Sequence, residues 1–136
     1  MKGKIYTVEE ANRTLPLVSR IAEDIVAGYG EVTSALQTYE TAKAAAQRDP
    51  GAQLGLRQAD ADVSEALERF QDLVEEIEAL GGTVKDYEHG LVDFYGDVEG
   101  EIVYLCWRRG EDAITHFHRL DEGFTMRRAL PAAQAA

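Results

Sequence analysis

The chain has 136 residues, of which 45% are hydrophobic and 29% charged, as in a globular domain with its own core. A formal net charge of −11 argues against nucleic acids and anionic membranes as partners, because both attract basic surfaces. The single cysteine excludes an internal disulfide. Residues 1–10 lack the apolar segment of a secretory signal, and no run approaches the ~20 apolar residues of a membrane span. We therefore expect a single cytoplasmic domain over residues 1–136.

Residues 7–47 carry the repeat of an amphipathic helix. Thr7 and Glu10 have the spacing of a capping box. Apolar or small residues then recur at steps of three and four, which is a heptad seam. The seam consists of Val8, Ala11, Leu15, Val18, Ala22, Ile25, Tyr29, Val32, Leu36 and Tyr39. Because Pro16 removes a backbone donor inside this stretch, we predict a short helix, a kink near Pro16, and a long helix capped by Thr14.

A second seam follows a turn. Residues 48–52 read Arg-Asp-Pro-Gly-Ala, in which proline restricts φ and glycine tolerates positive φ. Apolar residues again step by three and four from Leu56 to Leu80, and Gly81 and Gly82 provide a stop signal. Two such helices with a short connection predict an antiparallel helical hairpin over residues 1–81.

After Gly82 the repeat changes to two, the period of a β-strand. The expected strands are 84–87, 91–95, 102–108 and 113–119. Turn-forming residues at 97–100 and 109–112 indicate hairpins between them. The predicted fold class is α+β: the helical hairpin, an antiparallel meander of three to four strands over residues 82–128, and a frayed tail at 129–136.

The register decides which side chains share a face of the sheet. If both turns are four-residue loops, Tyr95 pairs with Ile102 and Arg108 with Ala113. His116 and His118 then lie on the apolar face that packs on the helices, and Cys106 lies on the opposite, mixed face. An error of one residue would reverse the faces of the last strand.

His116 and His118 are the first candidates for a metal site. One residue lies between them, so they are roughly 6.5–7 Å apart along the same face of a strand, and both imidazoles could bind one divalent metal ion. The side chains that would complete the ligand shell are Asp121, Glu111, Asp93 and His89. A His-x-His pattern has little specificity, and the more ordinary explanation is two hydrogen-bonded or solvated histidines at the sheet edge.

Five arginines in the last third of the chain form a second candidate site. The planar guanidinium suits bidentate contacts with a carboxylate or phosphate. The five are Arg108, Arg109, Arg119, Arg127 and Arg128. The ordinary alternative is ion pairing with the acids of the same region, Glu111, Asp112, Asp121 and Glu122.

Asp93 and Cys106 each stand in an apolar strand. Asp93 needs a partner if it is buried, and Tyr104 or Arg108 could serve. Cys106 needs a nearby base to act as a nucleophile. In the register above it points away from both histidines, which favours a small buried side chain without a catalytic role. Together with the arginines and their acidic neighbours, Asp93 forms the site proposed for a small ligand, which consists of Asp93, Arg108, Glu111 and Arg127.

Three segments resemble a bacterial family known only as domain of unknown function 2203. They read TVEEANRTLPLV at 7–18, GLVDF at 90–94 and YLCWRRGEDAITHFHRLDEGFTMRR at 104–128. The resemblance implies a helical hairpin followed by a small sheet and brings no activity, substrate or cofactor. The residues that fit the end of the family pattern are His118, Gly123, Phe124 and Arg127. His116 does not belong to that pattern.

The sequence leaves two classes of function open. Two amphipathic helices, and the lack of a recognised catalytic motif, favour a non-enzymatic protein that acts through association with itself or another protein. A homodimer through the helices is expected because isologous dimers are the commonest assembly. The alternative is a metal- or small-anion-binding protein, with an enzyme as one form of it, whose site lies around Asp93, Glu111, His116, His118 and Arg127.

Overall fold

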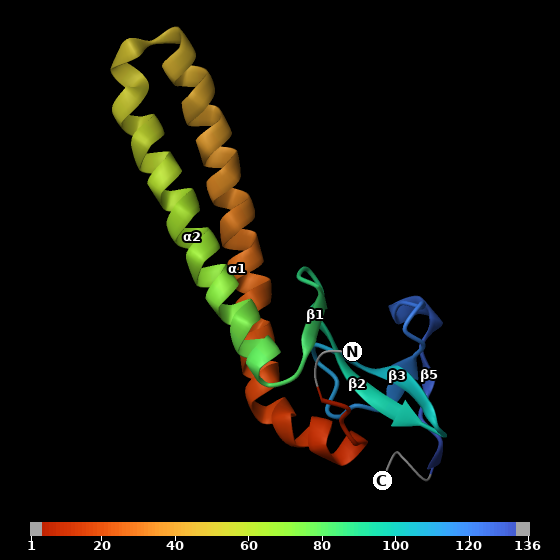
Figure 1. The fold of residues 1–136 in the computed structure, drawn as a ribbon. Coiled ribbons are helices and arrows are strands. Elements are labelled where there is room, and N and C mark those ends of the chain that lie inside the picture. Colours follow the sequence, from red (N-terminus) through yellow and green to blue (C-terminus); the bar gives the residue numbers. More distant parts are fainter. Residues whose placement is uncertain (1–3, 133–136) are drawn as a thin grey trace.

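The computed structural model describes residues 4–132 as a helical hairpin followed by an antiparallel sheet (Figure 1). The helices are α1 (Val8–Arg48) and α2 (Gln53–Ala79), joined by the 3₁₀ turn η1 (Pro50–Ala52). The strands are β1 (Thr83–Asp86), β2 (Leu91–Val98), β3 (Glu101–Arg108), β4 (His116–His118) and β5 (Arg128–Ala129). The 3₁₀ turn η2 (Phe124–Met126) lies between β4 and β5. The predicted α+β fold is confirmed, and β5 adds one short strand to the predicted meander.

Helix α1 begins with the predicted capping box. The Glu10 N–H donates to the Thr7 hydroxyl at 3.0 Å, and the Thr7 N–H donates to the Glu10 carboxylate at 2.9 Å. The helix runs through Pro16 without restarting at Thr14, whose hydroxyl donates to the Ala11 carbonyl at 2.7 Å. Figure 1 shows the red N-terminal part of α1 at an angle to the rest, as expected when proline removes a helical hydrogen bond.

The turn and the end of the hairpin follow the predicted signals. Asp49 accepts a hydrogen bond from the Gly51 N–H, and Pro50 occupies the first position of η1. Helix α2 ends at Ala79, and Gly81 follows with a φ of 97°. A Cβ at Gly81 would collide with the Tyr6 hydroxyl. Glycine is therefore required there by both backbone conformation and space.

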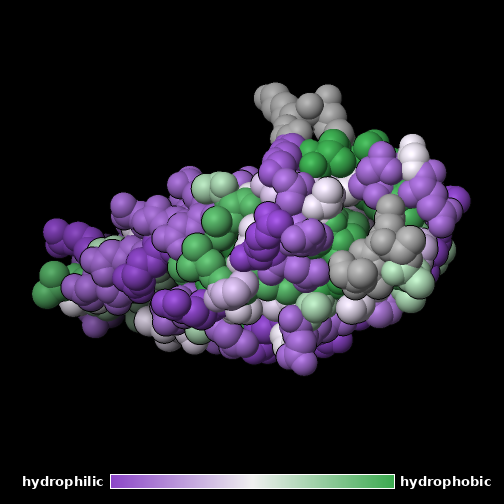
Figure 2. All heavy atoms as spheres, turned by 90° about the horizontal axis from the view of Figure 1, so that it is seen from below, coloured by the Kyte–Doolittle hydropathy of each residue, from purple (hydrophilic) through white to green (hydrophobic). Residues whose placement is uncertain are grey.

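The five strands form one sheet in chain order. One face packs on α1 and on the C-terminal end of α2 to form the core. The largest fully buried side chains of this core are Trp107, Phe94, Leu105, Ile114, Ile25, Ile77 and Val18. Figure 2 views the molecule from below and shows mainly hydrophilic residues on this surface, with hydrophobic residues in separate patches. Within residues 4–132, no helix has the length and apolar character needed to cross a membrane.

The turn between β2 and β3 is shorter than predicted. It consists of Glu99 and Gly100, whose φ values are 53° and 85°. Two positive φ values match the twist of the flanking strands, which favours a two-residue turn. Tyr95 therefore pairs with Tyr104 and not with Ile102. Because the register moves by two residues, the predicted faces of β2 and β3 are preserved.

The connection between β3 and β4 is longer than predicted. As a result, the side chains of β4 lie on the opposite faces of the sheet from those predicted. The Trp107 indole N–H donates to the Glu111 carbonyl at 2.9 Å, and the Ile114 N–H donates to Asn12 of α1 at 2.7 Å. These bonds draw the connection onto the helix, so pairing resumes only at His116, opposite Cys106. The predicted placement of both histidines on the core face, away from Cys106, is wrong.

The C-terminal tail is ordered further than predicted. Ala129 belongs to β5, and Leu130 is buried and donates its N–H to the Thr115 carbonyl at 2.9 Å. A frayed tail therefore does not begin at residue 129. The rest of the predicted tail, residues 133–136, lies outside the described residues.

Candidate functional site

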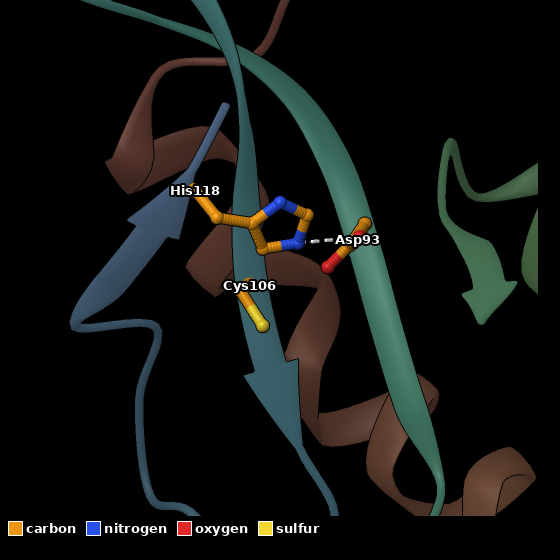
Figure 3. Close-up of side chains that lie close together, drawn as sticks. All are labelled: Asp93, Cys106 and His118. Atoms are coloured by element: carbon orange, nitrogen blue, oxygen red, sulfur yellow. Dashed lines mark hydrogen bonds and ion pairs between the residues drawn. The ribbon is translucent and has the colours of Figure 1, made fainter. Parts of the chain in front are cut away.

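Three adjacent strands bring Asp93, Cys106 and His118 together on the face of the sheet that points away from the helices (Figure 3). Asp93 of β2 is paired directly with Cys106 of β3. His118 of β4 is paired with Tyr104 and reaches back diagonally toward Asp93. One donor atom from each of the three side chains lies within 4.8 Å of the other two.

The three side chains are buried, with exposed fractions of 2% for Asp93, 1% for Cys106 and 3% for His118. His118 Nδ1 lies 2.9 Å from the Arg119 carbonyl oxygen. A carbonyl only accepts, so Nδ1 carries a proton. His118 Nε2 lies 2.9 Å from Asp93 Oδ2. Because a lone pair facing a carboxylate at that distance would repel it, a second proton lies between these two atoms.

The pKa values of Asp93 and Cys106 both rise. Burial raises the pKa of Asp93, and the charge of His118 opposes part of this rise. Burial and then the neighbouring Asp93 carboxylate raise the pKa of Cys106 to about 12. A nucleophilic cysteine needs a lowered pKa and a free base. Both ring nitrogens of His118 already have partners, so the site does not have the arrangement of a cysteine hydrolase.

A cavity of about 70 Å³ adjoins the three side chains. Its other walls are Lys85, Leu91, Glu122, Gly123 and Phe124. The last three belong to the segment that crosses over the sheet between β4 and β5. A cavity of this size has room for a metal ion with one or two small ligands.

Glu111 and Arg127 hold the covering segment in place. Arg127 donates two hydrogen bonds to the Glu111 carboxylate, at 2.9 and 2.6 Å. Its guanidinium also lies 4.2 Å from the centre of the Phe124 ring. Burial alone would raise the pKa of Glu111, but the hydrogen bonds from Arg127 and the Arg108 N–H lower it overall. These two predicted ligand-binding residues thus bind each other.

Two residues predicted as metal ligands, His116 and Asp121, do not belong to the group of donor atoms. His116 lies opposite Cys106, but its Nδ1 is 2.9 Å from the Thr115 hydroxyl. Asp121 is exposed and outside the group of donor atoms. Tyr104, one of the expected partners of Asp93, instead donates its hydroxyl to that of Tyr95 at 3.4 Å.

Sequence reasoning placed His118 on the wrong face of the sheet, whereas it placed Cys106 on the correct face but did not include it among the metal ligands. The available signal was Phe117, an apolar residue between two histidines. If Phe117 is assigned to the core, both histidines fall on the face of Cys106 and Asp93.

Comparison with known families gives one result. The family described as "Uncharacterized conserved protein (DUF2203)" matches residues 4–130. No curated protein and no solved structure matches the chain.

Proposed function

The chain belongs to the DUF2203 family of uncharacterised conserved proteins. We propose that it binds a single transition metal ion through Asp93, Cys106 and His118, and that this ion is zinc. The observation that carries this proposal is the convergence of three different donor atoms, all buried, within 4.8 Å of one another.

The ligand types favour zinc over harder ions. Thiolate and imidazole bind Zn²⁺ well, whereas Mg²⁺ and Ca²⁺ prefer oxygen ligands alone. Bonds of roughly 2.0–2.3 Å in a tetrahedral arrangement require ligand separations of about 3.3–3.8 Å. The donor atoms are already within 4.8 Å, so side-chain rotations would complete the geometry.

The surroundings of His118 also suit a metal ligand. A ligating histidine commonly donates its second ring N–H to a carbonyl, which fixes the tautomer and the ring orientation. The Nδ1–H of His118 donates to the Arg119 carbonyl, and Nε2 is directed at Asp93 (Figure 3). A zinc ion would replace the proton between Nε2 and Oδ2. The negative charges of Asp93 and the Cys106 thiolate would neutralise the ion in this buried position.

Three protein ligands beside a cavity leave one coordination position for water or a substrate. Structural zinc sites normally have four protein ligands, whereas catalytic sites have three and an open position. We therefore propose a reactive metal centre, in which the ion would polarise a bound group or activate water.

The experiment is a zinc competition titration against a chromophoric chelator, with His118→Ala and His116→Ala as a matched pair from the same strand. We expect stoichiometric binding by the native protein and by His116→Ala, and a loss of at least about a hundredfold in affinity for His118→Ala. Equal binding by all three proteins, or none by the native protein, would contradict the proposal.

Self-association through the helical hairpin is a second candidate function. The hairpin projects well beyond the sheet (Figure 1), and from residue 33 to 72 its buried residues are Ala46, Ala59 and Ala66. Large apolar side chains on this projecting part are exposed instead, with Leu36 at 45%, Leu54 at 73% and Leu67 at 38%. Alanine contacts bury little area, so a second copy that covers these leucines would stabilise the hairpin.

Sedimentation velocity tests this second candidate. We expect a dimer for the native protein and a monomer for the double variant Leu36→Glu, Leu67→Glu. The control is Leu17→Glu, since Leu17 is similarly exposed at 46% but lies in the N-terminal part of α1. A native monomer, or a dimer that survives the double change, would contradict self-association through this surface.

A further inference from the structure

The arginines of the last third of the chain differ in their ion pairing. Four are paired, at N–O distances of 3.0 Å for Arg109, 3.5 Å for Arg119, 2.6 Å for Arg127 and 2.9 Å for Arg128. Within residues 4–132, Arg108 forms no ion pair. Its guanidinium carbon lies 5.7 Å from the centre of the Phe124 ring. Arg108 is therefore the arginine of this group that is available to an external anion.

Arg108 lies beside the proposed metal site. It follows Cys106 by two residues on β3, so both side chains are on the same face, roughly 6.5–7 Å apart along the strand. Arg108 also lines a pocket of about 310 Å³ together with Asp86, His89, Leu91, Phe124 and Thr125. Leu91 and Phe124 line the smaller cavity at Cys106 as well. The pocket and the metal cavity are thus neighbours that share two walls.

The Arg108 guanidinium is the charged group of this pocket that can bind a ligand. Asp86 is the acid among the lining residues, and its carboxylate is engaged by His89. It accepts the His89 N–H at 2.9 Å and lies 3.2 Å from the ring Nδ1. The guanidinium of Arg108 and the hydroxyl of Thr125 remain as donors, and Leu91 and Phe124 provide apolar walls.

We propose that this pocket binds a small organic anion, with its carboxylate or phosphate group on Arg108 and its apolar body between Leu91 and Phe124. A second donor group at the other end of the molecule reaches the open coordination position of the metal. A volume of about 310 Å³ is at the lower end of the range for small-molecule sites. The contact at the metal rests on the proposed function, whereas the contact at Arg108 does not depend on it.

Calorimetric titration with 4-carboxyphenylphosphonate, which has an anionic group at each end of an apolar ring, tests the proposal on zinc-loaded protein. The variants are Arg108→Gln and, as the matched control, Arg109→Gln, whose side chain is paired with Glu23. We expect Arg108→Gln to weaken binding at least about tenfold, with its zinc affinity unchanged, and Arg109→Gln to bind like the native protein. Failure to bind at millimolar concentration, or equal binding by both variants, would overturn the proposal.

The same titration on metal-free protein separates the two proposals. Binding that depends on Arg108 and strengthens when zinc is present supports the whole inference. Binding that depends on Arg108 but is the same with and without zinc supports the anion pocket and overturns the reach to the metal. Zinc binding without any binding of 4-carboxyphenylphosphonate leaves the proposed function intact and overturns the pocket.

Discussion

A double-mutant cycle on Asp93 and His118 in metal-free protein measures the energy of the buried pair. Asp93→Ala leaves His118 Nε2 without its partner at 2.9 Å, in a position where the side chain is only 3% exposed. An unsatisfied buried group costs about 1–3 kcal/mol, and a hydrogen bond to a charged group contributes about 1.5–3 kcal/mol. We therefore expect each single variant to be destabilised and the double variant to lose less than the sum, with a coupling energy of about 2 kcal/mol.

The assay is urea unfolding in the presence of a chelator, followed by the fluorescence of Trp107, which is 1% exposed. At an m-value of about 2 kcal/mol/M, which is typical of small proteins in urea, about 2 kcal/mol corresponds to a shift of about 1 M in the urea midpoint. Asp93→Asn is the control, because its amide can donate to Nε2, and we expect a loss below about 1 kcal/mol. A coupling energy below about 0.5 kcal/mol would refute this description of the pair.

Three further predictions concern pH and glycine. Zinc affinity should rise about ten- to a hundredfold per pH unit between pH 6.5 and 8 in the chelator titration. The reason is that zinc displaces the proton of Cys106, whose pKa is about 12, and the proton between His118 and Asp93. A pH-independent affinity would be inconsistent with these ligands. The hydrogen bond from the Thr7 N–H, then the contact with Lys4, lowers the pKa of Glu10 to about 2, so the stabilisation by its charge is full above pH 4.5 and is lost as pH falls toward 2. The stabilities of native protein and Glu10→Gln should therefore differ above pH 4.5 and converge toward pH 2, and equal stabilities at every pH would refute a contribution of this charge. Gly81→Ala should lower the free energy of unfolding by more than about 1 kcal/mol because of its φ of 97° and the adjacent Tyr6, whereas Gly30→Ala, in an open helical position, should raise it by about 0.5–1 kcal/mol.

The helical half of the fold could be predicted because its signals are local. The Thr7–Glu10 capping box, the Pro50-Gly51 turn and the glycine stop at Gly81 each depend on a few neighbouring residues. The continuity of α1 through Pro16 could not be predicted in the same way. Packing of Leu15 and Val18 in the core stabilises both sides of the proline and outweighs the lost hydrogen bond.

The site depended on a register that local signals do not determine. The long-range hydrogen bond from Ile114 to Asn12 of α1, between residues separated by 102 positions, extends the connection before β4. That extension moves the register by one residue and carries His116 and His118 to the face of Cys106. Asp93 and His118 were recognised individually as candidates, but their contact with each other and with Cys106 required the structure.

The central claim is that Asp93, Cys106 and His118 bind zinc, and X-ray absorption spectroscopy at the zinc edge tests it most directly. Protein loaded with one equivalent of zinc should show one sulfur ligand at about 2.3 Å and nitrogen or oxygen ligands at about 2.0–2.1 Å. In Cys106→Ser the sulfur contribution should disappear. A native spectrum without sulfur, or one with six oxygen or nitrogen ligands, would contradict the account.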